Sequence, residues 1–378
     1  MLAALVNGRV LTAAGILDGQ AVLIEGGRIA GVVPLAEVPA SAARRDLAGG
    51  LLVPGYIDTQ VNGGGGVLFN DAPTVETIAA IGAAHRKFGT TGFLPTLISD
   101  DLSVVDQALR ATEAAIAAGV PGVLGVHIEG PFLNPKRKGI HDAGKFRILD
   151  EAAIALLSSL KVGRTLVTLA PERTTPETIQ RLADAGVHVA AGHTNASYAT
   201  LRQALDHGLT GVTHLFNAMS PLTSREPGVV GAVLENQDAW AGIIVDGRHV
   251  DPVTLKIALR ARPLDRFMLV TDAMPTVGMT DKRFTLQGQE IVVRDGVCVG
   301  EGGTLAGSDL DMAGAVRNAV RMLDLSIDDA VMMASAAPAA FLGLADQRGR
   351  IAPGYAADLC LLDDDLNVTA TWIDGNEG

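Results

Sequence analysis

From about residue 51 onward, short apolar runs alternate along the chain with longer amphipathic runs. Apolar runs of about four to eight residues bounded by Gly, Pro or Asn are typical of buried strands, whereas apolar residues that recur every three or four positions are typical of helices. The helical pattern is clear at 75–89, 101–119 and 176–186, where several runs end at a glycine, a common helix stop. The apolar runs predict eight strands, at 51–58, 91–97, 123–129, 165–171, 187–193, 211–216, 242–247 and 267–272.

Strands that alternate with helices predict a parallel sheet and an α/β fold. Eight such units are the number that closes a (β/α)8 TIM-like barrel. A doubly wound open sheet is the alternative, because the pattern along a sequence does not show closure. After the eighth strand, alternating residues around the Asp295-Gly296 pair predict a β-hairpin over 284–303, and helical patterns return at 309–344.

The two ends of the chain share a different pattern. Residues 1–50 hold alternating, glycine-punctuated strands, and residues 349–375 repeat that style. Strand-rich ends on either side of a barrel predict one small β-sandwich built from both termini. We therefore expect residues 1–52 and 348–378 to form the sandwich and residues 53–347 to form the barrel, which would be the catalytic domain.

Composition narrows the class of protein. Although 48% of the 378 residues are hydrophobic, no run reaches the ~18 uninterrupted apolar residues of a membrane span. The apolar start of the chain is broken at Asn7, Gly8 and Arg9, so we interpret it as a strand rather than a signal peptide and expect a cytoplasmic protein. The two cysteines, Cys298 and Cys360, lie far apart among apolar residues and are predicted to be reduced and buried.

The charge balance argues against polyanionic partners. Thirty Lys and Arg against 42 Asp and Glu give a net charge of −12, whereas proteins that bind nucleic acids usually carry basic stripes. The short basic run Lys136-Arg137-Lys138 is interpreted as a solvated loop. We expect neither a nucleic-acid nor a membrane partner, and a small molecule as the ligand.

A glutamate and two histidines each stand where an apolar run ends: Glu129, His193 and His214. In a parallel barrel, strand ends of one polarity meet at one mouth, so these distant residues are predicted to converge. Two imidazoles and a carboxylate leave a coordination position open, which is the pattern of a catalytic rather than a structural metal site. The sequence therefore predicts a divalent metal centre at the mouth.

Strand alternation adds two expectations. Residues two apart share one face of a strand, so His127 should lie on the same side as Glu129, whereas His188 should lie opposite His193 and pack against a helix. Asp272 ends the eighth strand and should reach the same mouth, where a carboxylate can carry a proton between water and a leaving group.

Several longer motifs carry a family resemblance. The tail motif RGRIAPGYAADL (348–359) is similar to that of the wider amidohydrolase superfamily. The following motifs run in the order seen in N-acetylglucosamine-6-phosphate deacetylases: PGYIDTQVNG (54–63), HIEGPFLNPKRKGIHD (127–142), GHTNA (192–196), THLFNAM (213–219), DGRHV (246–250), TDAM (271–274) and GTLAGS (303–308). The resemblance extends over essentially the whole chain.

The resemblance implies hydrolysis of N-acetylglucosamine 6-phosphate to glucosamine 6-phosphate and acetate, a step of amino-sugar catabolism. It implies one divalent ion per subunit on Glu129, His193 and His214, with zinc as the first expectation and Fe²⁺, Mn²⁺ or Co²⁺ as alternatives. Asp272 would be the general base and then the acid, and His141 would hydrogen-bond the amide carbonyl as part of the substrate site.

Family positions that hold the sugar phosphate match Asn217, Ala218, Arg225 and His249. The resemblance implies a homodimer in which Arg225 and His249 come from the neighbouring subunit. The sugar epimer stays open, so another N-acetylhexosamine phosphate such as N-acetylgalactosamine 6-phosphate is an alternative substrate. A non-catalytic sugar-phosphate sensor is the alternative from a different class.

One departure from the superfamily concerns the first strand. Most amidohydrolases carry His-x-His there, whereas this chain has Gln60 and Asn62. Neutral amides are poorer ligands for a transition metal than imidazole. We therefore predict a mononuclear site, with Gln60, Asn62 and His127 as outer-shell residues or remnants of a second metal position.

Overall fold

The computed structural model describes residues 2–378, so Met1, the first residue of the predicted N-terminal segment, lies outside the described residues. Its largest sheet contains eight parallel strands in sequential order. Each of the eight predicted runs overlaps one of them, which confirms the α/β class. The strands are β8 (Tyr56–Val61), β11 (Thr90–Ile98), β12 (Gly125–Glu129), β13 (Arg164–Leu169), β14 (His188–Ala191), β15 (Leu209–Val212), β16 (Trp240–Ile243) and β17 (Phe267–Leu269).

The sheet closes on itself just beyond the last strand. Val61 and Ala273 form a parallel bridge, and the amide of Asn62 donates to the carbonyl of Ala273 over 2.9 Å. The amide of Asp272 also donates to the carbonyl of Gln60 over 3.0 Å. The predicted (β/α)8 barrel is thus confirmed, and the open doubly wound sheet is wrong.

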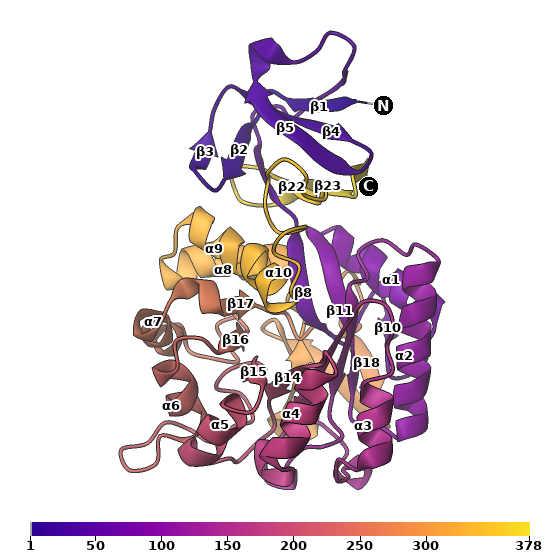
Figure 1. Cartoon of the computed structure of the whole chain (residues 1–378), viewed down its shortest axis with the longest axis vertical. Helices are drawn as coiled ribbons and strands as arrows, with labels where there is room; N and C mark the ends of the chain where they lie inside the picture. The colour runs from indigo at the N-terminus through magenta and orange to yellow at the C-terminus, as the bar shows by residue number, and fades with distance from the viewer. Residues whose placement is uncertain (1) are drawn as a thin grey trace.

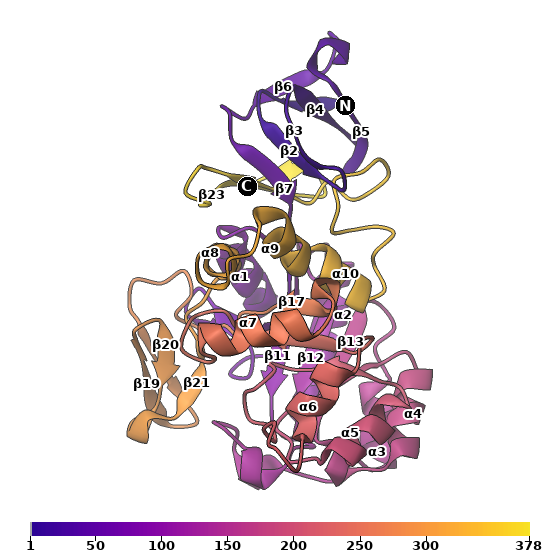
Figure 2. The same ribbon diagram turned by 90° about the vertical axis from the view of Figure 1, so that its left-hand side faces the viewer.

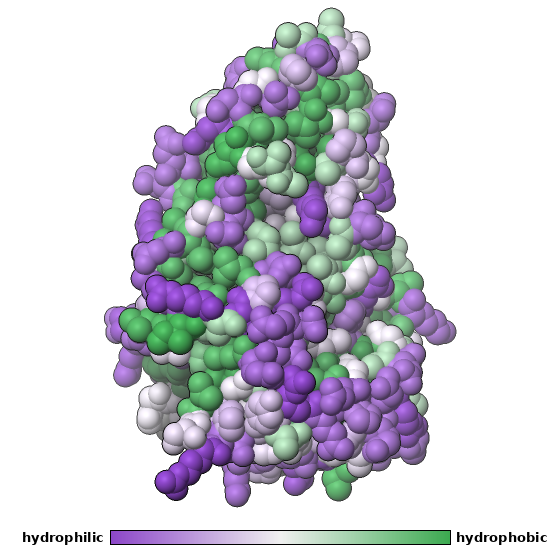
Figure 3. Space-filling model, turned by 60° about the vertical axis from the view of Figure 1, so that its left-hand side comes forward, coloured by the Kyte–Doolittle hydropathy of each residue, from purple (hydrophilic) through white to green (hydrophobic). Residues whose placement is uncertain are grey.

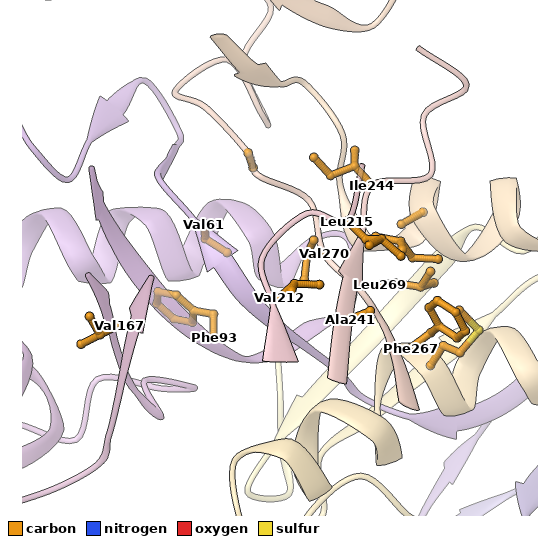
Figure 4. Close-up of a cluster of buried hydrophobic side chains, with 14 of the residues drawn as sticks. Val61, Phe93, Val167, Val212, Leu215, Ala241, Ile244, Phe267, Leu269 and Val270 are labelled. Carbon is orange, nitrogen blue, oxygen red and sulfur yellow. The ribbon is translucent and has the colours of Figure 1, made fainter. Parts of the chain in front are cut away.

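Helices surround the barrel, as Figure 1 shows. Several begin at a capping residue; for example, Thr74 accepts a hydrogen bond from the amide of Thr77, and Asp311 accepts one from that of Gly314. Side chains of the strands fill a continuous apolar core, part of which is drawn in Figure 4. The helices are α1 (Val75–Arg86), α2 (Leu102–Ala117), α3 (Glu151–Leu157), α4 (Pro176–Asp184), α5 (Tyr198–Leu205), α6 (Gly228–Glu235), α7 (Pro252–Ala261) and α8 (Met312–Leu323).

Two further helices, α9 (Ile327–Ala334) and α10 (Ala336–Phe341), lie at the amino ends of the barrel strands. Phe341 packs in one apolar cluster with residues of five barrel strands and with the residue that directly precedes β12. The ring of His188 lies 5.4 Å from that of Phe341. The amino end of the barrel is therefore plugged. The strand residues of the cluster are Ile57, Leu94, Leu166, Ala190 and Met268, and Leu124 directly precedes β12.

Strands from both termini form a separate unit above this plugged end (Figure 1). Its two sheets enclose their own apolar cluster, to which Leu52 and Leu361 belong. One sheet is ordered β5-β4-β1-β6 and the other β24-β23-β22-β7-β2-β3. The strands are β1 (Ala3–Val6), β2 (Arg9–Thr12), β3 (Gly15–Leu17), β4 (Gln20–Glu25), β5 (Arg28–Pro34), β6 (Ala43–Asp46), β7 (Leu51–Pro54), β22 (Leu359–Leu362), β23 (Val368–Ile373) and β24 (Asn376–Glu377).

The run 51–58, predicted as a single strand, is divided between the two units. Its first half is β7 of the terminal sheet, and its second half belongs to β8 of the barrel, with Gly55 between them. A Cβ at Gly55 would lie 2.2 Å from Oγ1 of Thr91. Only glycine therefore lets the chain pass from one unit to the other against β11.

Two insertions lie near the mouth. The predicted hairpin is confirmed between β19 (Gln289–Arg294) and β20 (Val297–Val299), and it extends into a four-stranded sheet with β18 (Arg283–Leu286) and β21 (Leu305–Ser308) (Figure 2). The four consecutive glycines at 63–66 lie in a small hairpin of β9 (Gly63–Gly64) and β10 (Val67–Leu68). The buried His85 of α1 supports it, with Nε2 2.9 Å from the carbonyl oxygen of Gly63.

The surface is mixed in polarity, and the two thiols are placed as the sequence predicts. Figure 3 shows hydrophilic residues over much of the lower half of the face it displays, with apolar residues more frequent toward the terminal β unit. Within residues 2–378, no helix is both long enough and apolar enough to cross a membrane. Cys298 and Cys360 are free and buried, as predicted.

Candidate active site

The three residues predicted as metal ligands converge at the mouth of the barrel. Glu129 is the last residue of β12, and His193 and His214 follow β14 and β15. Nε2 of His193 and Nε2 of His214 lie 3.2 Å and 3.1 Å from Oε1 of Glu129, and 3.1 Å from each other. All three side chains are buried. Barrel closure thus gathers side chains that are up to 85 positions apart in the sequence.

This donor set fits a divalent ion. One ligand atom from each of the three residues lies within 4.8 Å of the others. Nδ1 of His193 lies 2.8 Å from the carbonyl oxygen of Arg137, which can only accept, so Nδ1 carries the proton and Nε2 keeps its lone pair for a metal. In the metal-free fold, burial raises the pKa of Glu129, but hydrogen bonds and positive charge from protonated His193 and His214 outweigh it and hold this pKa well below its usual range. An anionic carboxylate with two imidazoles is a set that zinc and related ions accept.

The backbone turns at these positions into the left-handed region. His193, His214 and Asp272 have φ angles of 47°, 32° and 53°. Non-glycine residues adopt such angles at a cost of about 1 kcal/mol or more, and the strain is commonly found at functional sites. At these three positions the side chains therefore no longer alternate between the two faces of a strand.

Because the alternation ends before His193, the predicted strand face of His188 is wrong. It does pack against a helix, as predicted, but Ala190 of the same strand face joins the apolar plug inside the barrel. His188 therefore lies on the inner face of β14, at the plugged end, and not on the outer face. His193 reaches the mouth because its backbone departs from strand geometry.

Asp272 lies beside the cluster and is held by two amides. Nδ2 of Asn62 and Nε2 of Gln60 donate to its Oδ1 over 2.7 Å and 3.1 Å, and Nε2 of Gln60 also lies 3.3 Å from both carboxylate oxygens of Glu129. Burial, together with the charge of Glu129, raises the pKa of Asp272. A carboxylate of raised pKa suits proton transfer near neutral pH.

His127 faces the barrel interior below Glu129, on the face that alternation predicts. Its Nε2 lies 2.7 Å from Oγ1 of Thr168 and its Nδ1 lies 3.3 Å from Oγ1 of Thr96. Burial lowers the pKa of His127 to about 4. Its ring nitrogens are engaged by hydroxyl groups and it stands outside the three-residue cluster.

His141 comes from the loop after β12 and stands over the cluster. Its ring lies 4.3 Å from that of His193, and its Nδ1 lies 2.8 Å from Oγ of Ser99. Burial, reinforced by the neighbouring His193, lowers the pKa of His141 to about 3. The ring is therefore neutral over the ordinary pH range.

The cluster opens into a pocket of about 350 Å³. Asn217, Ala218 and His249 line it, as do Lys136 and Arg137. Lys136 is exposed and Arg137 is half-buried, so the basic run does lie in a solvated loop, but two of its members also line the pocket. Leu305 and Gly307 of β21 also line the pocket. They belong to the GTLAGS motif (303–308), to which the sequence analysis assigned no role.

The two residues implied to come from a neighbouring subunit differ in position. His249 lines the pocket of its own chain, and its Nδ1 lies 2.6 Å from Oδ2 of Asp246. Arg225 lies on the exposed loop before α6, outside the residues that line this pocket. The side chain of His249 thus lies at the pocket of its own chain, whereas that of Arg225 does not.

Comparisons with known proteins agree with this architecture. The model of the Amidohydrolase family matches residues 51–378, and the NagA composite domain matches residues 2–52. An N-acetylgalactosamine-6-phosphate deacetylase of Shewanella sp. (strain ANA-3) is 44% identical over 97% of this chain and 93% of its own length.

Two solved structures are also similar over the whole chain. The N-acetylglucosamine-6-phosphate deacetylase of Pasteurella multocida has a TM-score of 0.97 at 34% identity, covering 100% of both chains. A mutant N-acetyl-D-glucosamine-6-phosphate deacetylase of Mycobacterium smegmatis, in complex with N-acetyl-D-glucosamine-6-phosphate, has a TM-score of 0.91 at 35% identity and covers 100% of this chain and 98% of that one.

Proposed function

Because this chain belongs to the amidohydrolase family, we propose that it removes the acetyl group from N-acetylglucosamine 6-phosphate by hydrolysis, in amino-sugar metabolism. The observation that carries the proposal is the convergence of Glu129, His193 and His214 beside Asp272 at the only open end of the barrel strands described. The substrate complex of the Mycobacterium smegmatis relative supports the choice of sugar phosphate.

The chemistry follows from where each group lies. A divalent ion on Glu129, His193 and His214, with zinc as our first choice, supplies Lewis acidity beside the amide bond. Asp272, fixed by its two amide donors, accepts a proton from the attacking water. The water oxygen bonds to the acetyl carbon, the carbon–nitrogen bond breaks, and Asp272 returns the proton to the departing amine. The products are acetate and the free 2-amino sugar 6-phosphate.

Cations at the mouth support a phosphorylated substrate. Lys136 and Arg137 line the pocket next to the imidazole of His249, and these two basic residues form a local positive region in a chain whose net charge is −12. We propose that the phosphate lies among them and that Asn217 and Ala218 contact the sugar. We further propose a homodimer in which Arg225 of each chain completes the phosphate site of the other, since it is exposed and outside its own pocket.

A second candidate substrate is N-acetylgalactosamine 6-phosphate. The deacetylase of Shewanella sp., which is 44% identical to this chain, is named for that substrate. The two sugars differ only in the configuration of one hydroxyl group, so both place the same acetamide at the cluster. The relative kcat/KM of the two substrates decides between them.

The test is an acetate-release assay on the purified, zinc-loaded protein. We expect turnover with the phosphorylated N-acetylhexosamines, a large fall in kcat/KM with N-acetylglucosamine itself, and loss of turnover after chelation. Metal-loaded protein that releases no acetate from either sugar phosphate would refute the proposed function. Turnover that survives exhaustive chelation would refute the role of the metal.

A further inference from the structure

We infer that Ser99 is a positioning residue that fixes the tautomer of His141, so that His141 offers the substrate a hydrogen-bond donor at Nε2. Ser99 is the residue that directly follows β11, and it is buried at the mouth of the barrel. The consequence for catalysis rests on the proposed function, but the assignment of the tautomer does not.

The backbone amide and the hydroxyl group of Ser99 both contact Nδ1 of His141. The backbone amide of Ser99 donates to Nδ1 over 3.3 Å, and Oγ of Ser99 lies 2.8 Å from the same atom. A backbone N–H can only donate, so Nδ1 must be an acceptor and carries no proton. The single proton of the neutral ring therefore resides on Nε2.

The two donors of Ser99 together also oppose the doubly protonated ring. A proton on Nδ1 would point at the backbone N–H of Ser99, which would place two donors against each other in a buried site. The amide cannot turn away, because Ser99 continues directly from the hydrogen-bonded strand β11. The surroundings of Ser99 thus select one of the three protonation forms of His141.

Nε2 is the polar atom of His141 that remains for the pocket. His141 lines the pocket, and among residues 2–378 no group is hydrogen-bonded to its Nε2. With the proton on that atom, His141 can donate to the oxygen of the acetamide carbonyl and to the oxyanion that develops from it. It cannot accept a proton there, so the base must be another residue, which agrees with the placement of Asp272.

A packing role for Ser99 is the alternative to a positioning role. A Cβ at Gly130 would lie 2.3 Å from Oγ of Ser99, so the hydroxyl fills a narrow space beside β12. Oγ also lies 3.5 Å from the carbonyl oxygen of Glu129. A packing role would affect stability or substrate binding, whereas a positioning role affects the tautomer of His141 and the rate of the chemical step.

The direct test is ¹⁵N NMR of the zinc-loaded protein labelled at its eight histidines, with the signals of His141 identified from their loss in His141→Gln. We expect a protonated Nε2 and a bare Nδ1. A protonated Nδ1 in the wild-type protein would overturn the inference. Protein with the expected tautomer but no acetate release would instead refute the proposed function, so the two failures are distinguishable.

Ser99→Ala gives the kinetic test, because it removes the closer of the two donors. Only the longer bond of 3.3 Å from the backbone amide then opposes a proton on Nδ1, so we expect a minor population with Nδ1 protonated to appear. We also expect kcat to fall about tenfold with little change in KM, a loss on the scale of one hydrogen bond. Ser99→Thr keeps the hydroxyl and should restore both. The matched control is Ser335→Ala, which removes a buried hydroxyl that donates to Val331 over 2.6 Å at the plugged end.

The kinetic result can contradict the inference in two ways. Wild-type kcat in Ser99→Ala, together with an unchanged tautomer, would show that the hydroxyl has no such role. A fall in kcat with an unchanged tautomer would assign the loss to packing and would overturn the inference as well.

Discussion

Replacing Asp272 by Asn separates the catalytic role of this residue from its structural one. The amide keeps an oxygen at the position of Oδ1, where Asn62 and Gln60 donate over 2.7 Å and 3.1 Å, so both hydrogen bonds survive. The other carboxylate oxygen becomes an NH2 group of nearly the same size. The change removes the ability to accept a proton and leaves the packing in place.

The expected loss of activity is large. A positioned general base contributes about a hundredfold to ten-thousandfold to the rate, or about 3 to 5 kcal/mol. Asp272 would serve twice, first toward water and then toward the amine, so we expect kcat to fall by at least about a thousandfold. KM should change much less, because the groups that line the sugar end of the pocket are untouched.

Unlike the activity, the stability of the metal-free protein should not fall in Asp272→Asn. Burial and the neighbouring Glu129 raise the pKa of Asp272 in the metal-free fold, so its stabilising contribution is present at acidic pH and is lost as the pH rises and the carboxyl ionises. Asn carries no such charge. The metal-stripped Asp272→Asn protein should therefore be at least as stable at pH 7 as the metal-stripped wild-type protein.

The assay combines acetate release, metal content and thermal unfolding on the same preparations, with Asp324→Asn as an exposed control that also loses one charge. We expect bound metal close to the wild-type level, a Tm that is unchanged or higher without metal, and almost no turnover. Turnover within tenfold of wild type, at equal metal content, would refute the role of Asp272. A large fall in the Tm of the metal-free protein would refute the account of its electrostatics.

Three further predictions concern the dimer, the metal and the response to acid. Arg225→Ala should raise KM for the sugar phosphate far more than it lowers kcat. Mixing it with the Asp272→Asn protein should regenerate about a quarter of the wild-type sites if Arg225 acts across a dimer, whereas no recovery would place it in its own subunit. Elemental analysis should find one divalent ion per chain, and two tightly held ions would contradict the assignment of Gln60 and Asn62 as amide donors. Burial lowers the pKa of His85 to about 4, against about 6.5 when unfolded, so the stability that it supports is present above pH 6.5 and lost as the pH falls toward 4. The loss should reach about 3 kcal/mol in denaturant unfolding and shrink in His85→Gln, and an unchanged pH profile in that variant would contradict it.

The barrel could be predicted from the sequence because its strands are buried on both faces. Every residue of β8, β11 and β12 is buried, which gives the continuous apolar runs typical of a parallel sheet. The break at Gly55 could not be predicted in the same way, since the apolar run continues across it. The break depends on Thr91, which meets Gly55 only in the folded protein.

The convergence of the three cluster residues could also be predicted, because parallel strand ends share one edge of the barrel. The orientation of His193 could not, since it depends on a left-handed backbone angle rather than on alternation. Lys136 and Ser99 were missed for a related reason. Their importance arises where a loop folds back over a strand end, although Ser99 directly follows an apolar run, as Glu129 and Asp272 do.

The plug formed by Phe341 and α10 closes one of the two ends of the barrel to molecules that enter or leave the site. With the far end of the barrel filled, water, substrate and both products share one entrance. In the proposed reaction, an acetyl group bound at the cluster would be the innermost part of the substrate, and acetate would be released behind the larger amino sugar. Departure of the sugar phosphate would then set when acetate can escape, and the residues around the entrance would affect turnover as well as recognition.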